Sequence, residues 1–407
     1  MRSCWAAVII VCFGSVSYAQ NTMSDLLSFP LSDEEMGVVL AREEYLATHK
    51  FNSPWLRELD FRIRPDELET SLTDYRLRFG ILNPMEIKAN RDYYKLLLRQ
   101  QSFERKKTIN SALKRRYQLI IEGYFLVSSL DINEQNLAQL KRTKTLLLEE
   151  SKNDLGDLLA MEEEITKQEL TINSIRRGIA QMLPAYQQLG AEQLSLFAND
   201  RWITSGSIRE IIQQNADNET LDLLSDQQQL ERETSMLEIN KAEAFSNLGF
   251  VQTEYDTEGG DTRDEQIRFQ FGIQIPIFNT DRPDNQRREL ELIEERAEYV
   301  ATAKDEQSLR STQALAIVDF LKDWELLEDK SVELEAYQEV FDEIGGDLKQ
   351  FRQLREYRYY LEMKMLRTRM DIYTRYIDFL SESGELADQP YQNFLSDSLE
   401  SFELVPN

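Results

Sequence analysis

The side chains that most often carry catalysis are scarce in this chain of 407 residues. His49 is its one histidine, and Cys4 and Cys12 are its two cysteines, so a histidine-based metal site or a nucleophile–base pair lacks its parts. The sequence has no glycine-rich dinucleotide motif and no phosphate-binding loop. The carboxylate runs Glu149–Glu150 and Glu162–Glu164 lie in helical patterns, where a solvated face explains them. We therefore predict no catalytic residue, no cofactor, no metal site and no enzyme activity.

Arginine and glutamine side chains, in contrast, alternate with apolar ones in short segments. The clearest segment runs from Gln266 to Phe278 and reads Q-I-R-F-Q-F-G-I-Q-I-P-I-F. In a β-strand, successive side chains point to opposite faces of the sheet. Phe269 and Phe271 would therefore lie on one face, and Arg268 on the other. A strand of this kind separates an apolar environment from water.

Three further segments are predicted as strands. Residues 55–64 and 75–83 alternate in the same way, with arginines between apolar side chains, and residues 248–255 form a weaker strand. Together with residues 266–278 they give two antiparallel pairs, each with one apolar and one polar face.

Long helices must hold these strands in place. Glycine (15) and proline (9) are few and 29% of the residues are charged, which favours long helices over a many-stranded fold. Each strand pair is followed by two predicted helices. The first two cover about residues 85–152 and 158–182, where Pro184 ends the pattern, and the last two cover about 284–344 and 348–380, closed by Gly384. Shorter helices are predicted over 32–50, 208–214 and 218–244.

The chain is predicted to be built twice. The motif F-G-I-x-x-P begins at Phe79 and again at Phe271, 192 residues later. The motif G-D-L begins at Gly156 and again at Gly346, 190 residues later. We expect a first repeat over residues 20–195, a second over 196–390 and a C-terminal tail over 391–407.

The N-terminus indicates export. Residues 1–19 combine Arg2, an apolar run and a small-x-small ending, which is the order of a secretory signal peptide with cleavage expected after Ala19. No stretch after residue 19 reaches the roughly 18 consecutive apolar residues that a membrane-spanning helix needs. A membrane role would therefore depend on the strands. A net charge of −26 argues against nucleic acid as a partner.

Four strands cannot close a barrel alone, and open strand edges are not tolerated in lipid. Several copies are needed for closure, and three copies give about 12 strands. The expected fold is therefore mainly α with a small β part. It would consist of two repeats of a β-hairpin plus a long α-helical hairpin, and its strands would close into a barrel only with other copies of the chain.

The ordered set of these features resembles the TolC family of outer-membrane efflux and secretion channels. The resemblance is carried by the strand ending at Phe278, the helix over 218–244 before it, and the pattern from Tyr337 through Gly345 to Gly384. It implies a homotrimer with a trimeric 12-stranded β-barrel in the cell outer membrane and a helical tunnel that lies in the periplasm. It also implies docking of the helical tips onto a periplasmic adaptor of an inner-membrane transporter. The cargo would be small molecules or polypeptides moved passively.

Four sets of site residues follow, of which the docking tips and the entrance are what the resemblance implies. The adaptor-docking tips would be Asp154, Leu155, Gly156, Asp157, Leu158, Gly345, Gly346, Asp347 and Leu348, and the periplasmic entrance would hold Gln350 and Gln353. A charge on the lipid face costs about 2–4 kcal/mol at mid-bilayer, so polar strand residues should face the barrel lumen. The lumen set is Arg62, Arg64, Arg76, Arg78, Arg268 and Gln270, and the lipid-facing set is Phe79, Phe269, Phe271 and Ile273.

A second interpretation remains open. An exported periplasmic coiled-coil scaffold or adaptor-like protein with a soluble β region would also have long helices and an acidic surface. The regular alternation of arginines with apolar residues favours the channel.

Overall fold

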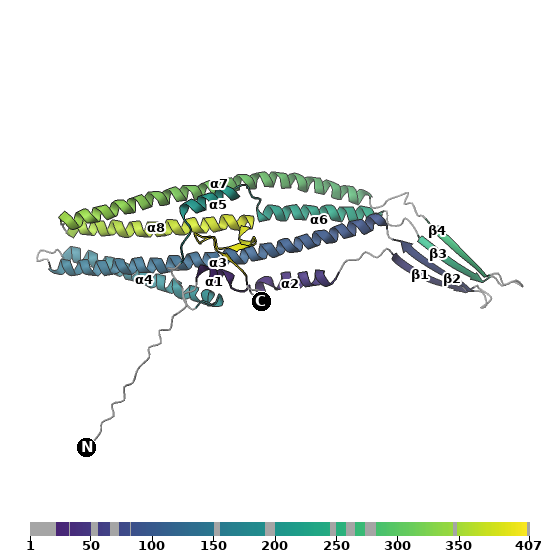
Figure 1. Cartoon of the computed structure of the whole chain (residues 1–407), viewed down its shortest axis with the longest axis horizontal. Helices are drawn as coiled ribbons and strands as arrows, with labels where there is room; N and C mark the ends of the chain where they lie inside the picture. Colours follow the sequence, from purple (N-terminus) through teal and green to yellow (C-terminus); the bar gives the residue numbers. More distant parts are fainter. Residues whose placement is uncertain are drawn as a thin grey trace, which may run out of the picture.

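The computed structural model describes residues 22–31, 33–49, 56–65, 73–81, 83–149, 155–191, 200–244, 250–257, 265–272, 282–344 and 348–404. The chain is an elongated body with a small sheet at one end and the ends of long helices at the other (Figure 1). The predicted signal peptide, residues 1–19, lies outside the described residues.

Two long helices, α3 (Pro84–Glu149) and α7 (Arg282–Ile344), run along most of the body (Figure 1). At 1.5 Å per residue, the 66 residues of α3 span about 99 Å. Two shorter helices lie end to end beside each: α2 (Asp33–Thr48) with α4 (Leu155–Gln188), and α6 (Leu221–Ala244) with α8 (Leu348–Ser383). α3 packs against all four, and α7 packs against α6 and α8. The helices therefore form a layer in the order α2/α4, α3, α6/α8, α7.

The sequence of α7 shows why it lies at an edge of this layer. Arg310, Ala314, Ile317, Leu321 and Trp324 are buried at steps of three and four residues. This spacing places them on one face of the helix. The remaining faces of α7 stay exposed although they carry large apolar side chains, namely Leu290, Ile293, Val300, Leu309, Leu315, Leu326, Val332, Tyr337 and Val340.

The same order of elements occurs in both halves of the chain. α1 (Met23–Ser28), α2, a strand pair, α3 and α4 are followed by α5 (Ser205–Asn215), α6, a strand pair, α7 and α8. The strands are β1 (Leu56–Pro65), β2 (Thr73–Ile81), β3 (Phe250–Thr257) and β4 (Glu265–Gly272). They form one antiparallel sheet in the order β1-β2-β3-β4, so β2 and β3 join the two halves.

The main apolar core lies in the middle of the body, where α1, α5 and the C-terminal segment pack on the long helices. The C-terminal segment contains the short 3-10 helix η1 (Glu385–Ala387) and the strands β5 (Tyr391–Gln392) and β6 (Ser401–Phe402). Residues 391–407 were expected to form a tail, but residues 391–404 are folded onto the body. The Tyr117 hydroxyl donates to the Gln392 carbonyl (2.7 Å) and accepts from the Phe394 amide (3.1 Å). Leu395 is fully buried.

One predicted helix end is wrong. The helix expected to end at Met182 continues through Pro184 to Gln188. Tyr186, in the turn after the proline, is buried and donates from its hydroxyl to the Leu119 carbonyl (2.8 Å). A Cβ at Gly123 would lie 2.0 Å from that hydroxyl oxygen. Packing of the Tyr186 ring against α3 thus stabilises a helical turn that proline alone disfavours.

Candidate functional site

The register of the sheet brings the predicted polar strand residues onto one face. In one row Arg62 lies opposite Arg76, which lies opposite Glu254, which in turn lies opposite Arg268. The next row contains Asp60, Arg78, Gln252 and Gln270. Arg64 lies opposite Asp74 on the same face by register, although its side chain is outside the described part.

Most charges on this polar face are compensated locally. Arg62 and Arg76 lie directly opposite each other, an arrangement that is unfavourable for like charges. Each has its own carboxylate: Arg62 pairs with Asp60 at 2.8 Å, and Arg76 pairs with Glu254 at 2.7 Å. The amides of Gln252 and Gln270 are joined by a hydrogen bond of 3.2 Å. A face with these groups suits contact with water.

The opposite face of the sheet is apolar and uncovered. Phe269 and Phe271 are 67% and 79% exposed, and Phe61 is 58% exposed. Phe79 is half-buried on the same face, and Ile273 lies outside the described residues. Phe61, Tyr75 and Tyr255 form an aromatic row across three strands, with ring centroids 6.4 Å apart at each step. An exposed apolar surface of this kind marks a contact with membrane or protein.

The glycine of the repeated F-G motif has a structural reason that the sequence did not reveal. Gly80 and Gly272 lie on either side of Phe250 in the sheet. A Cβ at Gly272 would lie 2.0 Å from Cε1 of the Phe250 ring. Phe250 is on the polar face, and its ring occupies the space that a side chain at Gly272 would fill. The Arg78 guanidinium lies over this ring, with its Cζ 3.9 Å from the centroid.

The predicted docking-tip residues that the structure describes lie at the end of the body farthest from the sheet (Figure 1). Leu155, Gly156, Asp157 and Leu158 form the first turn of α4, and Leu155 is 69% exposed. Asp154, Gly345, Gly346 and Asp347 lie outside the described residues, and Leu348 begins α8. Gln350 and Gln353, the predicted entrance residues, are exposed on the first turns of α8.

A buried ion pair near this end was not predicted from the sequence. The Arg355 side chain on α8 is 2% exposed and pairs with Glu164 on α4 at 3.1 Å. Glu164 is 31% exposed and also pairs with Arg352 at 3.5 Å. Burial lowers the pKa of Arg355, while the nearby Glu164 carboxylate raises it. Glu164 had been assigned to a solvated run, and it instead ties α4 to α8.

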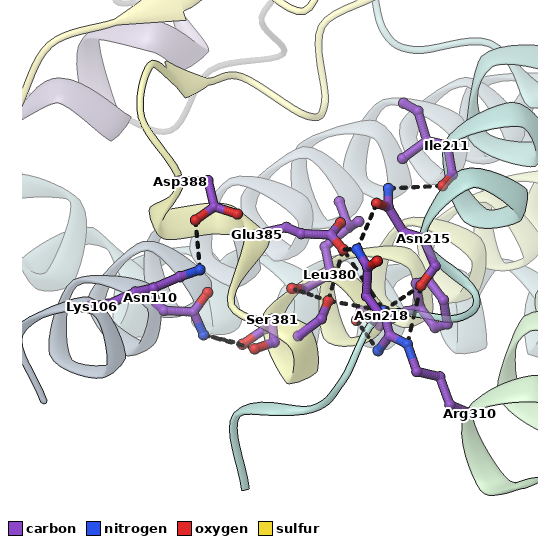
Figure 2. Close-up of polar contacts among 12 residues, drawn as sticks. Lys106, Asn110, Ile211, Asn215, Asn218, Arg310, Leu380, Ser381, Glu385 and Asp388 are labelled. Carbon is purple, nitrogen blue, oxygen red and sulfur yellow. Dashed lines mark hydrogen bonds and ion pairs between the residues drawn. The ribbon is translucent and has the colours of Figure 1, made fainter. Parts of the chain in front are cut away.

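A second polar cluster lies in the middle of the body (Figure 2). Arg310 of α7 has a side chain that is 2% exposed and lies 3.8 Å from Glu385. Its Nη2 donates to the Asn215 carbonyl (2.9 Å) and the Ser383 hydroxyl (2.9 Å), and its Nη1 donates to the Phe379 carbonyl (3.2 Å). Burial raises the pKa of the Glu385 carboxyl, partly offset by hydrogen bonds from Asn218 and Ser383 and by the charge of Arg310.

This cluster connects α7 to the first half of the chain. Asn110 of α3 donates to the Ser381 carbonyl at 2.8 Å, and Lys106 of α3 pairs with Asp388 at 2.5 Å (Figure 2). The arrangement fixes helices that meet at mid-length and offers no group positioned for catalysis. Within the described ranges, no set of three or more histidine, cysteine or carboxylate side chains is grouped to hold a metal ion. No helix in those ranges is long and apolar enough to cross a membrane.

Comparison with known proteins identifies the fold. No family model matches this sequence, and no curated protein matches it either. Solved structures do match: the outer membrane protein VceC from Vibrio cholerae has a TM-score of 0.58 at 12% identity, covering 89% of this chain and 95% of that one. The open state of the MtrE outer membrane channel from Neisseria gonorrhoeae matches with a TM-score of 0.57 at 10% identity, covering 93% of this chain and 90% of that one. The CmeC outer membrane channel from Campylobacter jejuni matches with a TM-score of 0.56 at 11% identity, covering 93% of this chain and 86% of that one.

The chain therefore has the fold of outer-membrane channel proteins, over about nine-tenths of its length. The resemblance to the TolC family that the sequence indicates is confirmed at the level of the fold. The mainly helical class with a small β part is confirmed as well.

Proposed function

We propose that this chain is one subunit of a homotrimeric outer-membrane duct of the TolC family. It would serve as the exit channel of a tripartite efflux pump or a type I secretion system, through which small molecules or polypeptides pass without catalysis. The four-stranded sheet would contribute one third of a 12-stranded barrel. The helices would form a tunnel wall in the periplasm.

The observation that carries this proposal is the two-faced sheet with open edges. In the part of the chain that the structure describes, β1 and β4 each have a strand neighbour on one side only. Backbone groups left unpaired in lipid cost several kcal/mol each. A sheet with an apolar, uncovered face can enter a membrane only if further strands complete it. Strands of 10, 9, 8 and 8 described residues approach the roughly 9–11 residues that a tilted membrane strand needs.

The helical layer supports a partner copy independently. Its two edges, α7 on one side and α2 with α4 on the other, expose large apolar side chains. On α4 these include Leu159 (63%) and Leu170 (64%), and on α7 they include Leu326 (57%) and Val340 (51%). Packing the α7 edge of one copy against the α4 edge of the next covers both, and repetition of this contact closes a ring.

The remaining roles complete the proposal. Arg62, Arg64, Arg76, Arg78, Arg268 and Gln270 would line the lumen, and Phe79, Phe269, Phe271 and Ile273 would face lipid. The tips Asp154–Leu158 and Gly345–Leu348 would dock onto a periplasmic adaptor of an inner-membrane transporter, with Gln350 and Gln353 at the entrance. The support for these roles is the shared face of the strand residues and the position of the first turn of α4 at the end of the body opposite the sheet (Figure 1).

Membrane fractionation combined with a mass measurement in detergent tests this proposal. We expect the protein in the outer-membrane fraction, with a mass of three copies. Phe269→Arg should abolish this assembly, because a cation on the lipid face costs about 2–4 kcal/mol per copy. Gln270→Arg, its neighbour on the polar face, is the matched control and should assemble normally. A monomer released with the soluble periplasmic proteins would instead favour the exported scaffold.

A further inference from the structure

The arginines of the polar face differ in how their charge is compensated. Arg62 and Arg76 are paired with Asp60 and Glu254. Arg268 also has an interaction partner. Arg78 differs, since no carboxylate among the described residues lies within ion-pair distance of its guanidinium. Asp60, which lies opposite Arg78 in the register, is instead engaged by Arg62.

Arg78 is nevertheless held in a defined place. Its guanidinium carbon lies 3.9 Å from the centroid of the Phe250 ring. Phe250 in turn lies between Gly80 and Gly272, and a side chain at Gly272 would collide with the ring. Gly272 thus makes room for the ring on the polar face, and the ring supports the guanidinium from one side. A stacked guanidinium keeps its N–H groups free at its edge for an acceptor.

The contact is also exposed. Arg78 is exposed on the polar face, next to the hydrogen-bonded pair Gln252 and Gln270. A pre-oriented guanidinium that faces water, with no ion-pair carboxylate among the described side chains, is a binding point for carboxylate, phosphate or halide ions. Because the whole chain carries a net charge of −26, such a cation locally opposes the repulsion that anions meet elsewhere.

We propose that Arg78, stacked on Phe250, is the anion-contact site of the duct and raises the passage of negatively charged solutes through it. The inference rests on the proposed function, because only a closed assembly turns one Arg78 into a ring of them around a lumen. At the level of Arg78 the duct wall would then favour anions over cations.

Ion selectivity of the full-length assembly in a planar bilayer tests this inference. The potassium-to-chloride permeability ratio is measured from the reversal potential in a potassium chloride gradient. Arg78→Gln should raise this ratio about twofold or more, the factor that one unit charge at roughly 10 Å produces in water. Arg78→Lys keeps the charge and should stay close to the wild type. The matched control is the double variant Arg76→Gln with Glu254→Gln, which removes a pair without changing the net charge and should leave the ratio unchanged.

A chemical rescue separates charge from folding. Arg78→Cys should show the raised ratio, and labelling that cysteine with a positively charged thiol reagent should bring the ratio back toward the wild type. A negatively charged reagent should raise it further. An unchanged ratio in both Arg78→Gln and Arg78→Cys would overturn the inference while the conductance itself upholds the duct. Absence of conductance from the wild type would refute the duct and the inference together.

Discussion

Replacing the buried Arg310 should loosen the middle of the body selectively. This guanidinium reaches the carbonyls of Asn215 and Phe379, near the C-terminal ends of α5 and α8, and the hydroxyl of Ser383. Arg310→Met preserves much of the volume but removes every donor. The two carbonyls and the Glu385 carboxylate would then lose a charged partner inside the protein.

The size of the effect follows from these contacts. Hydrogen bonds to a charged group contribute about 1.5–3 kcal/mol each, and removing one partner of a buried ion pair costs about 3–5 kcal/mol in total. Glu385 is 11% exposed, so water can replace little of what it loses. We therefore expect local opening to become easier by about 3–5 kcal/mol, which is a factor of roughly 10² to 10³ or more in the opening equilibrium.

Hydrogen exchange of the backbone amides measures this opening directly. Peptides from the ends of α5 and α8 should exchange faster by that factor in Arg310→Met, while peptides from the sheet should not change. Arg176→Met is the matched control, because Arg176 is 59% exposed in its pair with Glu134 and such pairs contribute about 0–1 kcal/mol. Equal exchange in the two variants would show that the buried cluster does not stabilise the region.

Three further predictions concern other parts of the chain. Gly272→Ala should destabilise the sheet by about 1–3 kcal/mol, because the new Cβ meets the Phe250 ring, and Phe250→Leu in the same chain should restore most of the loss in thermal denaturation. Burial raises the pKa of Glu385, so the folded state binds the carboxyl proton more tightly than the unfolded state does. The protonated carboxyl thereby contributes to the free energy of unfolding; this contribution is complete below the unfolded-state pKa and is lost as the pH rises through the folded-state pKa. On acidification from about pH 8 to about pH 4, below the ordinary pKa of a glutamate, the wild type should therefore gain thermal stability relative to Glu385→Gln, and an equal response of both proteins would contradict the assignment. Glu164→Gln should destabilise the packing of α4 on α8 by about 3 kcal/mol and Arg355→Met by about 1 kcal/mol, because the arginine is buried and the carboxylate remains partly hydrated. Susceptibility to protease measures both losses, and the reverse order would refute this account of the pair.

The sequence predicted the strands well because local periodicity determines them. The alternation over residues 55–64 and 75–83 corresponds to β1 (Leu56–Pro65) and β2 (Thr73–Ile81). The choice of polar and apolar face also follows from alternation alone, since the register keeps like faces together across all four strands.

Features that depend on distant contacts could not be predicted in this way. The reason for the glycine in the second F-G motif requires the pairing of β3 with β4, which places Phe250 opposite Gly272. The end of α4 depends on a pocket for Tyr186 against Gly123 rather than on Pro184. The C-terminal segment has no periodic pattern, and its burial depends on partners such as Tyr117 of α3.

The helix α8 illustrates a further limit. Its Tyr357 is 40% exposed, whereas the side chain of the nearby Arg355 is 2% exposed. Hydrophobicity alone cannot identify a buried arginine, because its burial depends on a carboxylate from another helix.

The central claim, that copies of this chain close into a duct, is tested most directly by electrical recording. Protein purified from the outer-membrane fraction is added to a planar lipid bilayer under an applied voltage. We predict discrete conductance steps from the wild type and none from Phe269→Arg, whose lipid-facing charge prevents insertion. A wild-type protein that leaves the bilayer as insulating as before, at concentrations where it is trimeric, would contradict the claim.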